Sequence, residues 1–105
     1  MSSSKEYLDY ILEQLSEADE ISHRAMMGEY ILYIHGRVLG GVYDDRLLVK
    51  PTPAARALMP DAPLEEPYPG AKEMLLVERM DDRDFLCRLA QAMYPELPEP
   101  RRKGK

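Results

Sequence analysis

The central part of the chain alternates short apolar runs with turn signals. Between residues 26 and 51, Val, Ile, Leu and Tyr fill the runs EYILYI, RVLGGVY and RLLVK, which begin at residues 29, 37 and 46. Such residues suit the pleated surface of a sheet. The runs are separated by His35-Gly36 and Asp44-Asp45, and links of two residues make tight antiparallel hairpins. The pattern predicts three strands here, with a positive φ at Asp45, and two more over residues 21–26 and 72–78.

Helical periodicity marks three other segments. Ser3 and Glu6 have the spacing of a capping box, and a stripe of apolar residues at helical period follows: Tyr7, Leu8, Ile11, Leu12 and Leu15. A second helix is predicted after Thr52-Pro53, because threonine suits the N-cap and proline the first helical position. It should end at Pro60.

A third helix is predicted to begin at Asp81 or Asp82, since a carboxylate is favourable at a helix N-terminus. It ends near Tyr94-Pro95 and turns one set of side chains inward: Phe85, Leu86, Leu89, Ala90 and Met93. The order is helix, four strands, helix, strand, helix. The predicted fold class is α+β, an antiparallel β-meander with helices packed on one face.

Two-residue links also predict which side chains share a face, because opposed residues in a hairpin lie on the same side. The first face is apolar throughout and is predicted to be the core: Ile31, Tyr33, Val38, Gly40, Val42, Leu47 and Val49. The second face has an apolar middle with cations around it: Tyr30, Leu32, Ile34, Arg37, Leu39, Gly41, Tyr43, Arg46, Leu48 and Lys50. In this register Tyr30 lies opposite Gly41 and packs over it.

A face exposed to solvent would be mostly polar, and the second face is not. We therefore expect it to bind another protein or a second copy of the chain. The predicted partner-binding residues are Tyr30, Leu32, Arg37, Leu39, Tyr43, Arg46, Leu48 and Lys50. An alternative is a small anionic ligand held by Arg37, Arg46 and Lys50.

Composition and charge narrow the class of protein. A chain of 105 residues is one domain, and a net charge of −5 with a pI near 5.0 argues against direct nucleic-acid binding. The single cysteine, Cys87, fits a reducing compartment. Neither a membrane span of about 20 apolar residues nor a signal-peptide pattern is present. We expect a cytoplasmic protein without a membrane partner.

Proline is confined to the second half of the chain, at or after Pro51. The last segment, PELPEPRRKGK, combines three prolines with four basic residues and offers little to bury. The sequence thus predicts a domain over residues 1–95 and a flexible proline-rich basic tail over residues 96–105.

Residues suited to catalysis or metal binding have structural interpretations. The acid pairs Asp44-Asp45 and Asp81-Asp82 fall in a turn and at a helix start. His23, His35 and Glu29 lack the spacing of a metal site, and Cys87 has no base that the sequence places beside it. We predict no catalytic residue, cofactor or metal, although an unrecognised enzyme stays an alternative.

Two further pairs are treated as structural. Met26-Met27 is interpreted as gap-filling core methionine rather than an interaction surface. Gly40-Gly41 is no phosphate-binding loop, because it lies inside a predicted strand rather than between a strand and a helix.

The ordered set of these elements resembles a known family. MMGEYILY, then GRVLGGVYDDRLLVK, a helix and the strand KEMLLVE are similar to the N-terminal domain of the TfoX (Sxy) family, over roughly residues 4–95. The resemblance implies an α+β sheet domain similar to secretion-chaperone folds. It also implies a bacterial regulator of natural competence that acts as a coactivator beside a DNA-binding transcription factor.

The chain departs from the family pattern in two ways. The turn Asp44-Asp45 stands where the family often has Asp-Gly, and residues 96–105 leave no room for the helical C-terminal domain of full regulators. We therefore expect a stand-alone N-terminal-type domain. The expected function is that of a non-enzymatic protein-interaction domain that regulates transcription through a sheet face.

Overall fold

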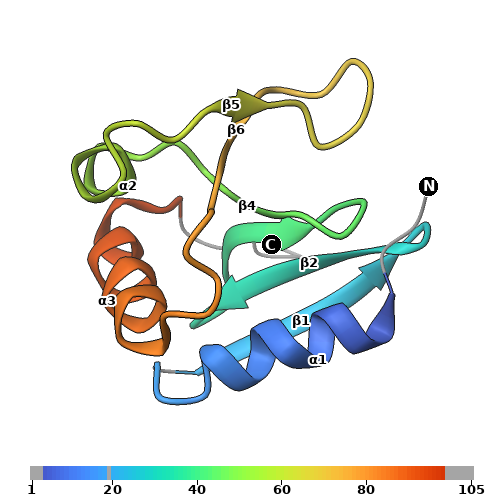
Figure 1. Ribbon diagram of the computed structural model, residues 1–105, viewed down its shortest axis with the longest axis horizontal. Coiled ribbons are helices and arrows are strands. Elements are labelled where there is room, and N and C mark those ends of the chain that lie inside the picture. Colours follow the sequence, from blue (N-terminus) through green and yellow to red (C-terminus); the bar gives the residue numbers. More distant parts are fainter. Residues whose placement is uncertain (1–3, 19, 99–105) are drawn as a thin grey trace, which may run out of the picture.

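The computed structural model describes residues 4–18 and 20–98. Its elements in chain order are α1 (Lys5–Gln14), β1 (Ile21–Met26), β2 (Glu29–Ile34), β3 (Arg37–Val42), β4 (Leu47–Val49), α2 (Pro53–Leu58), β5 (Leu64–Glu65), β6 (Met74–Leu76), α3 (Arg83–Met93) and the 3₁₀ turn η1 (Tyr94–Glu96). The strands form one antiparallel sheet in the order β1-β2-β3-β4-β6-β5 (Figure 1). The predicted α+β class is confirmed, and the short strand β5 was not predicted.

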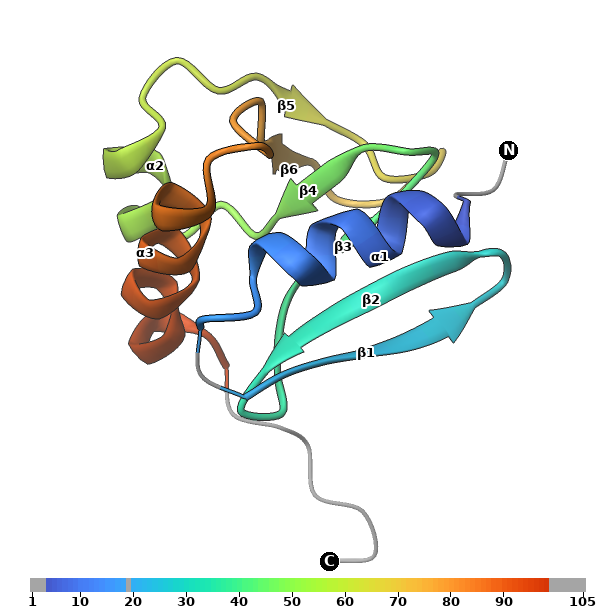
Figure 2. The same ribbon diagram turned by 60° about the horizontal axis from the view of Figure 1, so that its bottom comes forward.

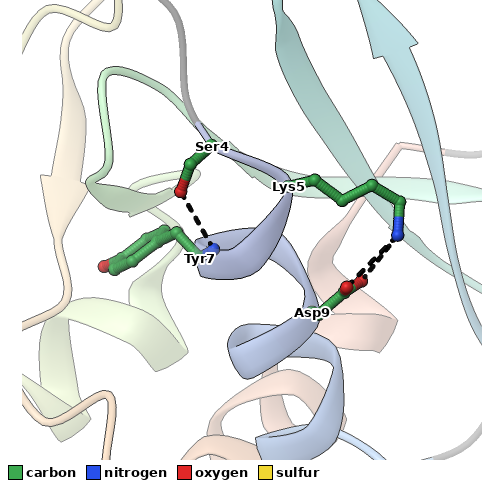
Figure 3. A network of polar contacts seen from close by, with 4 residues as sticks. All are labelled: Ser4, Lys5, Tyr7 and Asp9. Atoms are coloured by element: carbon green, nitrogen blue, oxygen red, sulfur yellow. Dashed lines mark hydrogen bonds and ion pairs between the residues drawn. The ribbon is translucent and has the colours of Figure 1, made fainter.

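Helix α1 begins one residue later than a capping box at Ser3 would place it. Ser4 is the N-cap, and its Oγ accepts a hydrogen bond from the backbone N–H of Tyr7 at 3.1 Å (Figure 3). Ser3 lies outside the described residues. The exposed Lys5 pairs with Asp9 one turn along the helix at 3.2 Å, a contact that stabilises the helix only slightly (Figure 3).

The caps of the other two helices are as predicted. The Oγ1 of Thr52 accepts from the backbone N–H of Ala55 at 3.2 Å, with Pro53 in the first turn. At α3, the Asp82 carboxylate accepts from the N–H of Phe85 at 3.1 Å. This hydrogen bond, followed by one from Arg79, lowers the pKa of Asp82, so the cap is ionised at neutral pH.

Three two-residue turns connect the first four strands. Both residues of Met27-Gly28, His35-Gly36 and Asp44-Asp45 have positive φ, between 50° and 85°. A type I′ turn requires this, and its twist matches that of the flanking strands. The predicted positive φ at Asp45 is confirmed, and Asp44 shares it.

The Met26-Met27 interpretation was wrong. Met27 occupies the tip of the β1–β2 hairpin and is 96% exposed, and Met26 is exposed too. Strand β1 is an edge of the sheet, and its residues 22–26 all face solvent. These methionines therefore fill no gap in the core.

Strand β3 contains an extra residue that shifts its register against β2. Tyr33 pairs with Val38, whereas the next pair joins Leu32 to Gly40, so Leu39 has no partner in β2. This is a β-bulge, and it breaks the alternation of faces along β3, so that Leu39 and Val42 both face the core. Beyond the bulge Tyr30 lies opposite Val42, which corrects the predicted pairing of Tyr30 with Gly41.

The bulge exchanges the two faces predicted for β2. Buried or core-packed residues of the sheet come from both predicted sets: Tyr30, Leu32, Ile34, Leu39, Val42, Leu47, Val49, Leu75 and Val77. They meet Leu8, Ile11 and Leu15 of α1, and Figure 2 shows α1 lying across β2 and β3. Ile31, Tyr33 and Val38, which were predicted as core, lie on the opposite face.

Two adjacent glycines make this arrangement possible. A Cβ at Gly40 would lie 2.1 Å from the carbonyl oxygen of Leu48, so β4 approaches β3 more closely than any side chain allows. A Cβ at Gly41 would lie 2.6 Å from the ring of Tyr43. The aromatic ring that lies next to Gly41 thus belongs to Tyr43, the residue that follows β3, and not to Tyr30.

Ordered packing continues past residue 95. Leu97 is 3% exposed and belongs to the core, and the Arg37 guanidinium donates to the carbonyl oxygens of Tyr94 and Leu97 at 3.3 and 3.1 Å. Part of the segment predicted as a tail is therefore docked. The remainder of it, residues 99–105, lies outside the described residues.

Replacing Gly40 tests the close approach of β4. We expect Gly40→Ala to lower the free energy of unfolding by about 3 kcal/mol, because the new methyl group meets backbone atoms that cannot rotate away. Urea denaturation measures the change. The exposed Ser22→Ala in β1 is the control, expected within about 0.5 kcal/mol of the parent. A Gly40→Ala protein as stable as the control would contradict the bulge geometry.

Candidate functional site

The face of the sheet opposite α1 and α3 is the outer face. Its side chains come from four strands and the residues that flank them: Ile31, Tyr33, Val38, Tyr43, Arg46, Leu48, Lys50, Met74 and Leu76. Ile31, Tyr33 and Val38 keep part of their surface in solvent, whereas Tyr43 and Leu48 are buried. An apolar band on an uncovered face is a common feature of contact sites.

A loop over residues 66–73 forms a wall beside this band. Pro67 is buried, and the next residue, Tyr68, is 54% exposed. The N–H of Ala71 donates to the carbonyl of Tyr68 at 3.1 Å, with Gly70 at a φ of 87°. Pro69 and Gly70 occupy the positions that a type II turn favours. The turn holds Tyr68 at the surface beside a fixed proline.

Arg46 links this segment to the sheet through hydrogen bonds and an ion pair. One guanidinium nitrogen lies 2.6 Å from Oε1 of Glu65, and the other donates to the carbonyl of Glu66 at 3.4 Å. Its Nε donates to the carbonyl of Tyr43 at 3.1 Å. Both side chains of the Arg46–Glu65 pair are about one third exposed, which leaves the pair partly shielded from water.

Two hollows lie side by side along the loop. The larger, about 420 Å³, is here called the groove, and its main side chains are Val38, Tyr43, Lys50, Tyr68, Lys72 and Met74. The smaller, about 290 Å³, is here called the acidic hollow, and it is lined by Glu29, Asp44, Arg46, Glu66, Pro67, Tyr68 and Pro69. Pro67 and Tyr68 line both, so Tyr68 is the ridge between them.

Tyrosine side chains gather at this ridge. The rings of Tyr43 and Tyr68 lie 6.3 Å apart in a tilted arrangement. Burial raises the pKa of Tyr43, and Tyr68, Glu29 and Tyr33 raise it further. The Tyr43 hydroxyl is therefore uncharged at neutral pH, and the floor of the groove offers apolar ring surface.

The predicted partner-binding residues do not form one surface. Leu32 and Leu39 are buried in the core, and Tyr30 packs against it. Arg37 stacks over the ring of Tyr94 at 4.6 Å. Only the members after the bulge lie on the outer face: Tyr43, Arg46, Leu48 and Lys50.

Several contributors to the two hollows were not predicted. Tyr68, Lys72 and Met74 line the groove, and Glu66 lines the acidic hollow. The dipeptide Pro69-Gly70 is a turn signal that marks the loop. No comparable signal in the sequence shows that the loop lies against β3 and β4.

Three of the residues considered for chemistry, Asp45, His35 and Cys87, have structural partners. Asp45 accepts from the N–H of Ser4 at 2.9 Å, and Nδ1 of His35 lies 3.0 Å from Glu20. The Cys87 thiol lies 3.6 Å from the carbonyl oxygen of Gln14. Within residues 4–18 and 20–98, no three His, Cys, Asp or Glu side chains are placed to hold a metal ion. No helix in the same ranges is long and apolar enough to cross a membrane.

A double-mutant cycle tests the link between the loop and the sheet. We expect Arg46→Gln and Glu65→Gln to show a coupling free energy of about 1 kcal/mol, near the upper end for partly exposed pairs. Urea denaturation of the parent, both single variants and the double variant gives this value. The exposed pair Lys5–Asp9 is the matched control, with a smaller coupling. A coupling near zero at Arg46–Glu65 would mean that the loop is held by other contacts.

The raised pKa of Tyr43 predicts a dependence on alkaline pH. A tyrosine whose folded-state pKa exceeds its unfolded value stabilises the fold below the unfolded pKa, and this contribution is lost as pH rises past about 10. The parent should therefore lose more stability than Tyr43→Phe between about pH 9 and about pH 11. Denaturation curves at both pH values decide it. Equal losses in the two proteins would contradict burial of the Tyr43 hydroxyl.

Comparison with known proteins supports the resemblance found in the sequence. A family model for the TfoX N-terminal domain matches residues 13–96. The chain is also 32% identical, over 106 residues, to an uncharacterized 12.7 kDa protein in the trpE 5′ region of Spirochaeta aurantia. That match covers 97% of this chain and 91% of the relative. No solved structure matches the chain. The chain belongs to the TfoX N-terminal domain family.

Proposed function

We propose that this domain is a non-enzymatic regulatory module of the competence type, and that it acts by binding a protein through the outer face of its sheet. The family to which it belongs is associated with the regulation of competence. The observation that carries the proposal is the half-exposed Tyr68, which projects beside the groove on a face that α1 and α3 do not cover.

The residue types around the groove favour a protein as the partner. Tyrosine is among the residues that contribute most of the binding energy at protein interfaces, and Tyr68 is held in place by the turn that follows it. The neighbouring Ile31, Tyr33 and Val38 extend the apolar surface along β2 and the start of β3. A fixed aromatic side chain on such a band loses little conformational entropy when it binds.

The contacts of the three predicted cations give little support to the anionic-ligand alternative. Arg37 donates to carbonyl groups of the C-terminal segment, and Arg46 is paired with Glu65. Lys50 lines the groove, whereas Arg46 lines the acidic hollow. A site for a small anion needs donors that converge on one point, and these three do not.

Charge also supports an indirect role in transcription. A net charge of −5 and the carboxylates beside Tyr68 disfavour contact with the phosphate backbone of DNA. The proposed domain therefore works beside a DNA-binding protein instead of reading DNA itself. We place it in the cytoplasm, where its single cysteine stays reduced.

Transcript profiling in the source organism tests the proposal. The gene is deleted, or replaced by a gene with Tyr68→Ser, and RNA levels and DNA uptake are measured under conditions that induce competence. We expect Tyr68→Ser to reproduce the deletion, because the variant removes the exposed ring without touching the core. The matched control is Tyr10→Ser on α1, where the tyrosine is 41% exposed and lies away from the outer face.

The control should behave as the parent, at an equal amount of protein in the cell. A deletion that leaves competence transcripts and DNA uptake unchanged would overturn the regulatory role. A Tyr68→Ser protein that complements the deletion fully would overturn the assignment to the outer face.

A further inference from the structure

The two hollows beside Tyr68 carry opposite charge. The lining of the groove contains two lysines, Lys50 and Lys72, and one glutamate, Glu73. The lining of the acidic hollow contains three carboxylates and one guanidinium, that of Arg46, which is already paired with Glu65. The three carboxylates are those of Glu29, Asp44 and Glu66. The exposed ring of Tyr68 stands between a basic and an acidic area of the same surface.

A surface of this kind is complementary to itself. Consider a two-fold axis that lies in the plane of the outer face and passes beside Tyr68. The axis is perpendicular to the line that joins the two hollows. Rotation about it sets the groove of one copy against the acidic hollow of the other. Each of the two contacts then joins lysines to carboxylates, as an isologous interface requires.

We propose that the partner bound by the outer face is a second copy of this chain, in a symmetric dimer centred on Tyr68. The proposal rests on the proposed function, since it names the protein that the same surface binds. Lys50 and Lys72 of one protomer face Asp44 and Glu66 of the other, and the reverse contact repeats this pairing. The two Tyr68 rings and the flanking apolar band are enclosed between them.

The charge of the whole chain makes this orientation selective. Two copies with a net charge of −5 each repel one another, so association needs a local match of opposite charges. The other in-plane two-fold axis would set lysines against lysines and carboxylates against carboxylates, which is unfavourable. Charge complementarity thus selects one arrangement out of those that the apolar band alone would allow.

Analytical ultracentrifugation of the purified chain is the first test. We expect a monomer–dimer equilibrium in low salt that shifts toward monomer as salt is added, because screening weakens exposed charge pairs. Tyr68→Ser should raise the dissociation constant at least about tenfold, the size of effect typical of a central interface residue. Tyr10→Ser should leave it unchanged.

A charge exchange tests the orientation. The acidic variant carries Lys50→Glu and Lys72→Glu, and the basic variant carries Glu66→Lys and Asp44→Asn, since asparagine tolerates the positive φ of that turn. Each variant alone should be monomeric, and an equimolar mixture should form a heterodimer. Arg56→Glu with Arg88→Glu changes the net charge as much as the acidic variant does, on exposed helical positions, and should still dimerise. Circular dichroism confirms that every variant is folded.

A monomer at every protein concentration and salt would overturn the proposal and leave a different protein as the partner. Dimers that both charge variants still form alone would overturn the orientation and with it the self-complementary surface. These outcomes are independent of transcription, because they are measured on purified protein. Conversely, the purified protein could form a charge-dependent dimer while deletion of the gene leaves the competence transcripts unchanged. That result would overturn the regulatory role alone.

Discussion

The extra residue of β3, Leu39, has no partner in β2, and this bulge is the constraint that decides the rest of the structure. Side chains alternate along a strand, so one extra residue moves everything beyond it to the other face. Without the bulge, Leu32 of β2 and Leu47 of β4 would point to opposite sides. With it, Leu32 and Leu47 both pack under α1, and Ile31 and Tyr33 are turned outward. The core and the candidate contact surface therefore have one common cause.

Local features were predictable, and the faces of the sheet were not. Two N-caps, at Thr52 and Asp82, and two tight turns, at His35-Gly36 and Asp44-Asp45, were predicted because each depends on residues within a few positions of each other. The bulge depends instead on how two strands meet, and β2 is apolar on both sides, so its pattern fits either face. Gly40-Gly41 inside a strand was the available signal, because glycine there often marks a bulge or a close backbone approach.

The residues of the candidate site likewise divide into those that the local sequence predicted and those that it did not. Tyr43, Arg46 and Lys50 were assigned to the correct face because the Asp44-Asp45 turn has the predicted length and no bulge lies between β4 and the end of β3. Tyr68 was missed because its position depends on contacts remote in sequence. Strand β5 must pair with β6, and Arg46 must reach Glu65, 19 residues away, before the loop lies against the sheet.

The three tight turns have a consequence for the order in which the chain folds. Each joins neighbouring strands across only two residues, so β1 to β4 can assemble with little loss of loop entropy and in microseconds. Strand β6 joins β4 only after the long connection between Val49 and Met74 has closed, which is slower. The hairpin core then forms early, and the surface around Tyr68 is among the last parts of the molecule to become native.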